Sequence, residues 1–189
     1  GMDHNDTALQ FYVLLSFWAF AEYIVSPEKK WIPIIGISAG CAILNKWLLG
    51  LAVFLPWGIL LILDIFQTRN IKKAIPFIIS LIICCAVFLP WQIYIINKWP
   101  LLAQYEYEFN RRHIYEALEG HHGSIWFYVE RSFNLMGYMV YLIPVGILGL
   151  FLDKKYNYKI LSSYSIIALF VFSFLSFVVA TKVEAHIFF

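Results

Sequence analysis

The residues able to do chemistry gather in four short clusters, each just outside an apolar stretch. The first is Asp3-His4-Asn5-Asp6, and the second is Lys46 alone, between two apolar runs. The third lies in the longest polar connection and the fourth is the segment 181–186. Members of the third are Arg111, Arg112, His113, Glu116, Glu119, His121 and His122. Carboxylates beside imidazoles suit a divalent metal or a hydroxyl, whereas guanidinium and ammonium groups suit a phosphate.

Each cluster also has an ordinary structural explanation. Asp6 or Thr7 would serve as the N-cap of a helix, and Lys46 would extend from a hairpin turn to the membrane surface. The third cluster would be a solvated charged helix, and the fourth an interface anchor. The isolation of Lys46 argues against a purely structural role, because no other charged residue lies between Lys30 and Asp64. An ionisable residue in such a setting is a functional hypothesis by default.

Composition indicates a membrane protein. Hydrophobic residues make up 61% of the 189 and charged residues 14%, whereas soluble domains run at about 45–50% and about 25%. The apolar stretches are 9–25, 31–45, 47–66, 74–96, 135–152 and 160–180. All except the short second stretch are near the ~20 residues that span a bilayer as a helix. We predict an all-α polytopic transmembrane bundle, a single transmembrane domain over 1–189 with interfacial helices in an outer loop at 97–134.

The charges of the connections predict the orientation of this bundle. Three connections, 26–30, 67–73 and 153–159, hold with their helix ends eight basic residues against four acidic ones. The basic residues are Lys29, Lys30, Arg69, Lys72, Lys73, Lys154, Lys155 and Lys159. The other connections and the termini hold six basic residues, eight acidic ones and all five histidines. The positive-inside rule places the basic connections in the cytoplasm, with both termini and the four clusters outside.

The outer loop carries a second helical pattern. Leu101, Leu102, Tyr105 and Phe109 recur at helical spacing, and Glu108, Arg112 and Glu116 are i, i+4 neighbours. This predicts an amphipathic helix in the outer interface. The aromatic segment 125–134 continues along the interface and turns inward near Gly137.

Glycine, proline and cysteine positions predict details of the packing. Gly36 and Gly40 form a G-x-x-x-G pair, which favours helix contact within the same bundle over dimerisation. A tight hairpin is expected around Asn45-Lys46-Trp47. Pro56 is expected to kink its helix, and Pro90 with Trp91 to loosen one near the outer interface. Cys41, Cys84 and Cys85 all fall in apolar stretches and are expected as small core residues rather than disulfides.

The order of these residues resembles the GT-C class of polytopic glycosyltransferases, in the branch of protein O-mannosyltransferases and aminoarabinose lipid A transferases. Members carry an outer Asp before a helix, as at Asp6, and a Gly-x-x-x-Gly segment that ends in a Thr-Lys-Gly-like turn, here at Lys46. They continue with Leu-Pro-Trp, here 89–91, and an outer loop with His-Ile and a later His, here 113–114 and 121–122. The segment 181–186 approximates the family's Lys-Leu-Pro-x-Tyr-like motif, which lies where the last helix leaves the membrane.

The resemblance implies transfer of a sugar from a polyprenyl-phosphate donor to a lipid, glycan or protein acceptor on the non-cytoplasmic side. It implies lipid-phosphate or donor binding by Lys46, Arg112, His113, His122 and Lys182. Asp6 would be a supporting acid, and Asp3 and Asp6 would hold a divalent metal ion if one is used. No nucleic acid is expected as a partner. Asn45 and Trp47 replace the family's Thr and Gly, and the exit lacks its proline and tyrosine, which puts those two motifs in doubt.

The family's main catalytic Asp lies in a large outer loop after the first transmembrane helix, and nothing in this sequence corresponds to that loop. The sequence therefore reads as an internal piece of a longer enzyme and is expected to be inactive alone. Short loops favour a bacterial inner or plasma membrane with the active face outward. Alternatives are a secondary transporter, which would place ionisable groups at mid-depth in several helices, and a structural membrane subunit, in which the four clusters would not meet.

Overall fold

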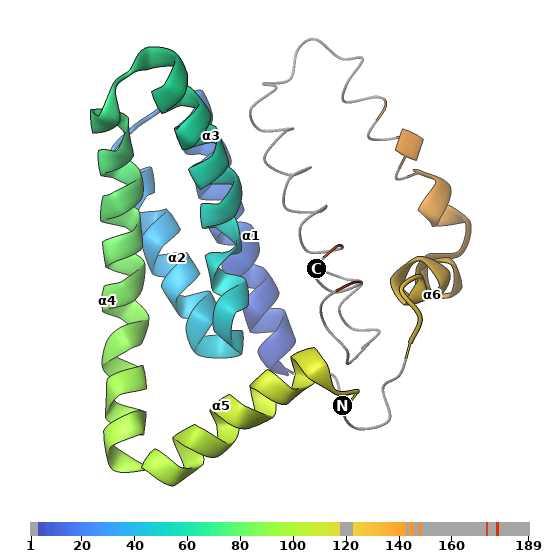
Figure 1. The fold of residues 1–189 in the computed structure, drawn as a ribbon. Helices are drawn as coiled ribbons and strands as arrows, with labels where there is room; N and C mark the ends of the chain where they lie inside the picture. The colour runs from blue at the N-terminus through green and yellow to red at the C-terminus, as the bar shows by residue number, and fades with distance from the viewer. Residues whose placement is uncertain are drawn as a thin grey trace. The chain divides into compact units, whose positions relative to one another are not determined.

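The computed structural model describes residues 4–117 and 123–142 and the single positions 144, 145, 148, 173 and 177. Every regular element of the two long ranges is helical, as Figure 1 shows, which confirms the predicted all-α class. The α-helices are α1 (His4–Val25), α2 (Trp31–Lys46), α3 (Phe54–Thr68), α4 (Ile75–Lys98), α5 (Pro100–Tyr115) and α6 (Phe127–Met136). Shorter 3-10 elements are η1 (Trp47–Val53), η2 (Ile71–Ala74) and η4 (Gly137–Tyr141).

Three helical segments are long and apolar enough to cross a membrane: Thr7–Val25, Leu49–Thr68 and Ile71–Lys98. Trp31–Asn45 is equally apolar but shorter, as the sequence predicted for the second stretch. The first four predicted stretches thus correspond to α1, α2, η1 with α3, and α4. Of the two remaining stretches, 135–152 is described in part, and 160–180 only at positions 173 and 177.

The chain divides into two compact units, the first comprising 1–95 with 157–167 and the second 96–156 with 168–189. Unit 1 contains α1, α2, η1, α3, η2 and nearly all of α4. Unit 2 begins in the last turn of α4 and contains α5, α6 and η4. The prediction of a single transmembrane domain, with its outer loop at 97–134, stays a prediction.

Glycines allow α2 to lie directly against α4. A Cβ atom on Gly36 would lie 2.5 Å from the carbonyl oxygen of Ser80, and one on Gly40 would lie 2.7 Å from Cβ of Val87. Only glycine permits such an approach between helix backbones. The G-x-x-x-G pair is therefore a contact within the bundle, as predicted, and α2 and α4 lie side by side in unit 1 (Figure 1).

Trp57 forms the centre of an aromatic core that joins α1, α3 and α4. Its side chain is 6% exposed. Its ring centroid lies 5.4 Å from those of Phe20 and Tyr23 of α1 and 5.3 Å from that of Phe77 of α4. Tilted and edge-to-face rings at these distances attract one another beyond simple burial. The Trp57 side chain thus links α3 to both α1 and α4.

The cysteines fit the expectation of core residues, since all three are free, Cys84 is buried and Cys41 and Cys85 are half-buried.

The hairpin predicted around residues 45–47 is present, and Gly50 makes it tight. η1 folds back along α2, and a Cβ atom on Gly50 would lie 2.5 Å from the carbonyl oxygen of Ala39 and 2.6 Å from the amide nitrogen of Ile43. The family's glycine directly after the lysine is Trp47 here, and the close approach occurs one turn later. Gly50 therefore provides the space for the close approach of η1 to α2.

The two prolines lie in different helical surroundings. Pro56 lies in the first turn of α3, directly after η1, where its missing N–H would have had no partner inside the helix. It follows a change from 3-10 to α-helix, and the predicted kink stays a prediction. Pro90 lies inside α4, which continues to Lys98, so the helix does not end at the Leu-Pro-Trp motif.

In unit 2 the predicted loop helix is α5. It begins with Pro100 at its first position and ends where the Glu116 N–H donates to the carbonyl of Arg112. Leu101, Leu102 and Tyr105 are exposed, as expected of a helix whose apolar side needs a membrane surface or a partner. α6 ends at Gly137, whose φ of 56° lies in the left-handed region, so the predicted turn at this glycine is present.

Candidate functional site

Four predicted site residues belong to helices whose backbone is described. Asp6 lies in the first turn of α1, Lys46 is the last residue of α2, and Arg112 and His113 lie in α5. Among the predicted site residues, only Arg112 has a described side chain. Asp3, His122 and Lys182 lie outside the described residues.

Asp6 and Lys46 lie at the same end of unit 1. α1 and α2 are neighbours joined by the connection 26–30, and the rings of Trp18 and Trp31 meet at 5.1 Å. From this contact, a rise of 1.5 Å per residue places Lys46 about 22 Å along α2 and Asp6 about 18 Å along α1 in the same direction. The two backbone positions are thus level to about one helical turn.

The Leu-Pro-Trp motif reaches the same level on α4. α2 and α4 run parallel, because Gly36 lies against Ser80 and Gly40 lies against Val87. Continuing that register places Lys46 about 9 Å beyond Gly40, and the stretch 91–93 at the same depth. Three of the motifs that carry the family resemblance therefore lie at the same depth along the helix axes, at one end of unit 1. We call this the Lys46 end.

Aromatic side chains of α4 indicate where this end meets the membrane surface. The rings of Trp91 and Tyr94 stack at 5.6 Å, and both are about half exposed. Trp and Tyr gather at the headgroup level of membranes. The Lys46 end is thus suited to the interface rather than to the hydrocarbon core.

Asn45 has a structural role at the end of α2. Its side-chain amide donates to the carbonyl oxygen of Cys41 at 2.8 Å. The bond reaches back one turn to a carbonyl within α2, as polar side chains in helices often do. The replacement of the family's threonine by asparagine therefore keeps a hydrogen-bonding side chain next to Lys46 in the sequence.

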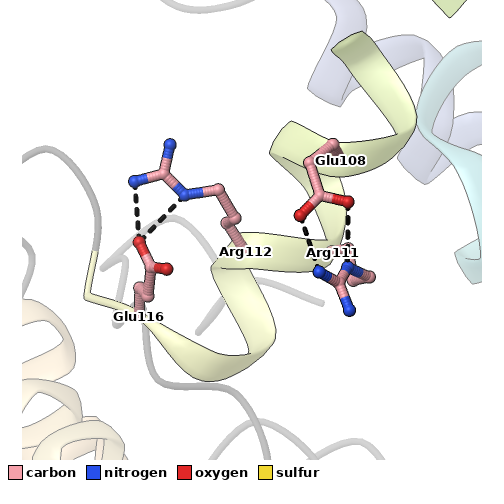
Figure 2. Close-up of polar contacts among 4 residues, drawn as sticks. All are labelled: Glu108, Arg111, Arg112 and Glu116. Atoms are coloured by element: carbon pink, nitrogen blue, oxygen red, sulfur yellow. Dashed lines mark hydrogen bonds and ion pairs between the residues drawn. The ribbon is translucent and has the colours of Figure 1, made fainter. Parts of the chain in front are cut away.

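The charged residues of α5 form two separate pairs, which Figure 2 shows. Arg111 binds both carboxylate oxygens of Glu108 through Nε and Nη2, at 3.0 and 2.7 Å. Arg112 donates Nε and Nη2 to one oxygen of Glu116, at 2.9 and 2.7 Å. The i, i+4 neighbours Arg112 and Glu116 therefore pair as their spacing suggests, whereas Glu108 pairs with Arg111 at i, i+3 instead.

These pairs affect the acid–base properties of an exposed surface. The hydrogen bond from Arg111 lowers the pKa of Glu108, and the hydrogen bond to Glu116 raises the pKa of the Arg112 guanidinium. Both arginines stay charged throughout the physiological range. Exposed pairs of this kind contribute little to stability, so their guanidinium groups can exchange a carboxylate for a phosphate oxygen at small cost.

Basic residues also gather at the other end of unit 1. Here the connection 26–30 and the segment 69–74 lie beside the ends of α1 and α3, and we call this the basic end. Lys73 binds both oxygens of Asp64, at 2.9 and 2.8 Å. The two residues are nine positions apart, so helical spacing gives no hint of their contact. This pair, like Gly50 and Trp57, was not anticipated from the sequence.

The described residues bear on the predicted metal site and on the transporter alternative. They contain no group of three histidine, cysteine or acidic residues placed to hold a metal ion; Asp3 lies outside them and the Asp6 side chain is not described, so the metal stays a prediction. The buried polar side chains of the described part are Ser16, Ser38 and Ser80. Among the side chains that the structure describes, which do not include those of Asp6 and Lys46, no charged group is buried, whereas an ion pathway would place such groups at mid-depth in several helices.

Comparison with known proteins gives one family. The family model for dolichyl-phosphate-mannose-protein mannosyltransferases matches residues 4–105, more than half of the chain. The match covers α1 to α4 and the first turn of α5, and so includes Asp6, Lys46 and the Leu-Pro-Trp motif. Arg112, His113, His122 and Lys182 lie beyond it. No curated protein and no solved structure matches the chain.

Proposed function

This chain belongs to the dolichyl-phosphate-mannose-protein mannosyltransferase family of membrane glycosyltransferases, and on that premise we propose that the Lys46 end binds a lipid-linked sugar donor. The donor is a sugar joined through its anomeric carbon to a polyprenyl phosphate. The acceptor is a hydroxyl group of a lipid, glycan or protein that approaches from the non-cytoplasmic side of the membrane.

The proposed reaction needs one carboxylate and several cations. The acceptor oxygen attacks the anomeric carbon while its proton passes to a carboxylate base. The bond between the anomeric carbon and the phosphate oxygen breaks, and the polyprenyl phosphate leaves with the electron pair. Cationic groups stabilise the negative charge that develops on this phosphate. In this scheme Asp6 is a supporting acid, and Lys46 is the cation nearest the phosphate.

The observation that carries the proposal is the shared depth of Asp6, Lys46 and the Leu-Pro-Trp motif at one end of unit 1. A donor whose phosphate lies at the headgroup level and whose tail lies in the bilayer needs its cation at that depth. Neither α2 nor η1 contains an acidic residue, so the nearest sequence neighbours of Lys46 give it no counter-ion. A lipid phosphate supplies one.

The remaining site residues keep the roles implied by the family resemblance. Arg112, His113, His122 and Lys182 are proposed to contact the phosphate or the sugar. Asp3 and Asp6 offer the oxygen ligands that Mg²⁺ or Mn²⁺ prefers, and a metal held there would neutralise phosphate charge. The proposed location is a bacterial inner or plasma membrane with this face outward.

Substitution of Lys46 in the full-length protein tests the proposal. Lys46→Ala is expected to lower turnover of dolichyl-phosphate-mannose at least a hundredfold, and Lys46→Arg, which keeps the charge, is expected to restore part of it. Lys98→Ala is the matched control, because Lys98 lies on α4 beyond the Leu-Pro-Trp motif. Equal activities of Lys46→Ala and the unsubstituted protein, measured as release of polyprenyl phosphate, would contradict the phosphate role.

A further inference from the structure

The basic end of unit 1 contains a cavity that the glycosyl transfer at the Lys46 end does not use. Its volume is about 600 Å³, and it is lined by the last turns of α1 and α3, by η2 and by the start of α4. All of its lining residues belong to unit 1. A volume of this size is typical of small-molecule sites. The cavity therefore needs an explanation of its own.

The inner wall of the cavity is apolar and aromatic. Trp57, Phe20 and Tyr23 line it, and the contacts between their rings keep them in place. Leu60 and Leu63 of α3 add aliphatic surface. Phe20 and Trp57 are almost fully covered by other side chains, so Tyr23, Leu60 and Leu63 supply the accessible apolar surface, which suits hydrocarbon.

The rim of the cavity is polar and carries one uncompensated cation. Lys73 is held by the Asp64 carboxylate, which leaves Lys72 as the lining cation that forms no ion pair within the described part of the chain. Lys72 is exposed. Asn70 fixes the backbone beneath it by accepting a hydrogen bond from the Lys72 N–H at 3.1 Å. The rim thus presents a single positive charge on an ordered turn.

We propose that this cavity binds the headgroup of an anionic membrane phospholipid, with the phosphodiester at Lys72 and the first part of the acyl chains against Leu60 and Leu63. Three properties of the cavity match this ligand. Its wall is apolar, its free charge is one positive unit, and it opens at the ends of two membrane-length segments, where headgroups lie. A phosphodiester carries one negative charge, which Lys72 balances while Asp64 keeps Lys73 occupied.

The proposal predicts in which direction lipid binding changes when Asp64 is replaced. In the present arrangement its carboxylate both occupies Lys73 and repels an anion. Asp64→Asn would remove that negative charge and free the Lys73 ammonium for the phosphate. Binding of the lipid should therefore become tighter in this variant, although the ion pair is lost. A purely structural role for the pair predicts no gain in binding.

The test uses the full-length protein in nanodiscs of phosphatidylcholine to which phosphatidylglycerol is added, with bound lipid counted by native mass spectrometry. Phosphatidylglycerol should be retained in preference to phosphatidylcholine. Lys72→Gln should weaken its retention about tenfold, since a hydrogen bond to a charged group is lost, and Asp64→Asn should strengthen it. Lys29→Gln is the matched control, because it removes the same charge from the basic end but does not line the cavity.

Two results would overturn the proposal. Equal losses in Lys72→Gln and Lys29→Gln would mean that the lipid responds only to the general positive charge of this end. A rise in the thermal midpoint with soluble glycerol phosphate in pure phosphatidylcholine nanodiscs, equal to the rise with phosphatidylglycerol, would mean that the ligand is a soluble phosphate and not a lipid. Both comparisons are independent of glycosyl transfer.

Discussion

The two ends of unit 1 carry lysines under opposite conditions. At the basic end, Lys30 lies 2.8 Å from Glu28 and Lys73 lies 2.8 Å from Asp64, so part of the positive charge is balanced within a few residues or across a turn. At the Lys46 end, one lysine stands in a run without other charges between Lys30 and Asp64. It shares its depth with Asp6 and the Leu-Pro-Trp motif.

This difference separates charges that orient a membrane protein from charges that act on a substrate. Lysines that are clustered and locally paired satisfy the positive-inside rule and need no ligand. A lysine isolated by apolar sequence is costly to keep unless an anion approaches it. The comparison between the two ends therefore predicts that equivalent substitutions should have different consequences.

The largest expected effect distinguishes the two ends of α1. Asp6→Asn should lower donor turnover about 10–100-fold, because Asp6 is proposed as a supporting acid and a metal ligand, and groups that support a reacting centre contribute about that much. Glu22→Gln removes a carboxylate from the other end of the same helix and should leave turnover unchanged. The measurement is release of polyprenyl phosphate by the full-length protein. Similar losses in both variants would show that α1 responds to general charge loss.

The next effect concerns the core beside the basic end. Trp57→Ala should lower the free energy of unfolding by about 3–5 kcal/mol, since it empties a buried aromatic site. Trp91→Ala, at the Lys46 end, removes a side chain that is 51% exposed and should cost much less. Thermal unfolding in detergent compares the two. A larger loss for Trp91→Ala would contradict the central packing role of Trp57.

Glycine substitutions test the register that aligns the motifs. Gly36→Ala should destabilise the fold by about 1–3 kcal/mol, because the new Cβ would overlap the Ser80 carbonyl oxygen. At Gly58 the nearest atoms to a new Cβ lie 3.8 Å away, which is ordinary contact. Gly58→Ala should therefore be neutral or slightly stabilising. If the two variants unfold at the same temperature, α2 and α4 do not pack as described.

The smallest effect concerns a locally paired charge at the basic end. The hydrogen bond from Lys30 holds the pKa of Glu28 below its ordinary value of 4.5. Because the folded pKa is depressed, the pair stabilises the fold above the ordinary pKa, and this contribution is lost as the pH falls through the folded pKa. Lys30→Gln should raise the Glu28 pKa toward 4.5, and Lys29→Gln should leave it unchanged. A carboxyl NMR titration measures both.

Sequence patterns predicted the helices, and much of their packing, for a clear physical reason. A lipid environment requires every backbone group to bond within its own helix, so length and apolarity alone predicted α1 to α4. Gly36 and Gly40 indicated a helix contact because only small residues allow one in lipid. Helical spacing likewise predicted α5 and the pairing of Arg112 with Glu116.

Other features could not be predicted because they depend on residues far apart in the chain. The Asp64–Lys73 pair joins the end of α3 to η2, and the partners of Trp57 come from α1 and α4. The 3-10 segment before Pro56 could not be predicted either, because apolar sequence alone does not distinguish a 3-10 from an α-helix. Of the candidate site, the order of motifs predicted the residues, while their common depth required the register of three helices.

The central claim is that Asp6 and Lys46 belong to the non-cytoplasmic end of unit 1 and the connection 26–30 to the cytoplasmic end. Single cysteines at Asp6→Cys and at Lys29→Cys, in the full-length protein with Cys41, Cys84 and Cys85 replaced by alanine, test it directly. An impermeant maleimide added to intact cells should label the first, and should label the second only after the membrane is opened. Labelling of both positions from the same side would contradict the account.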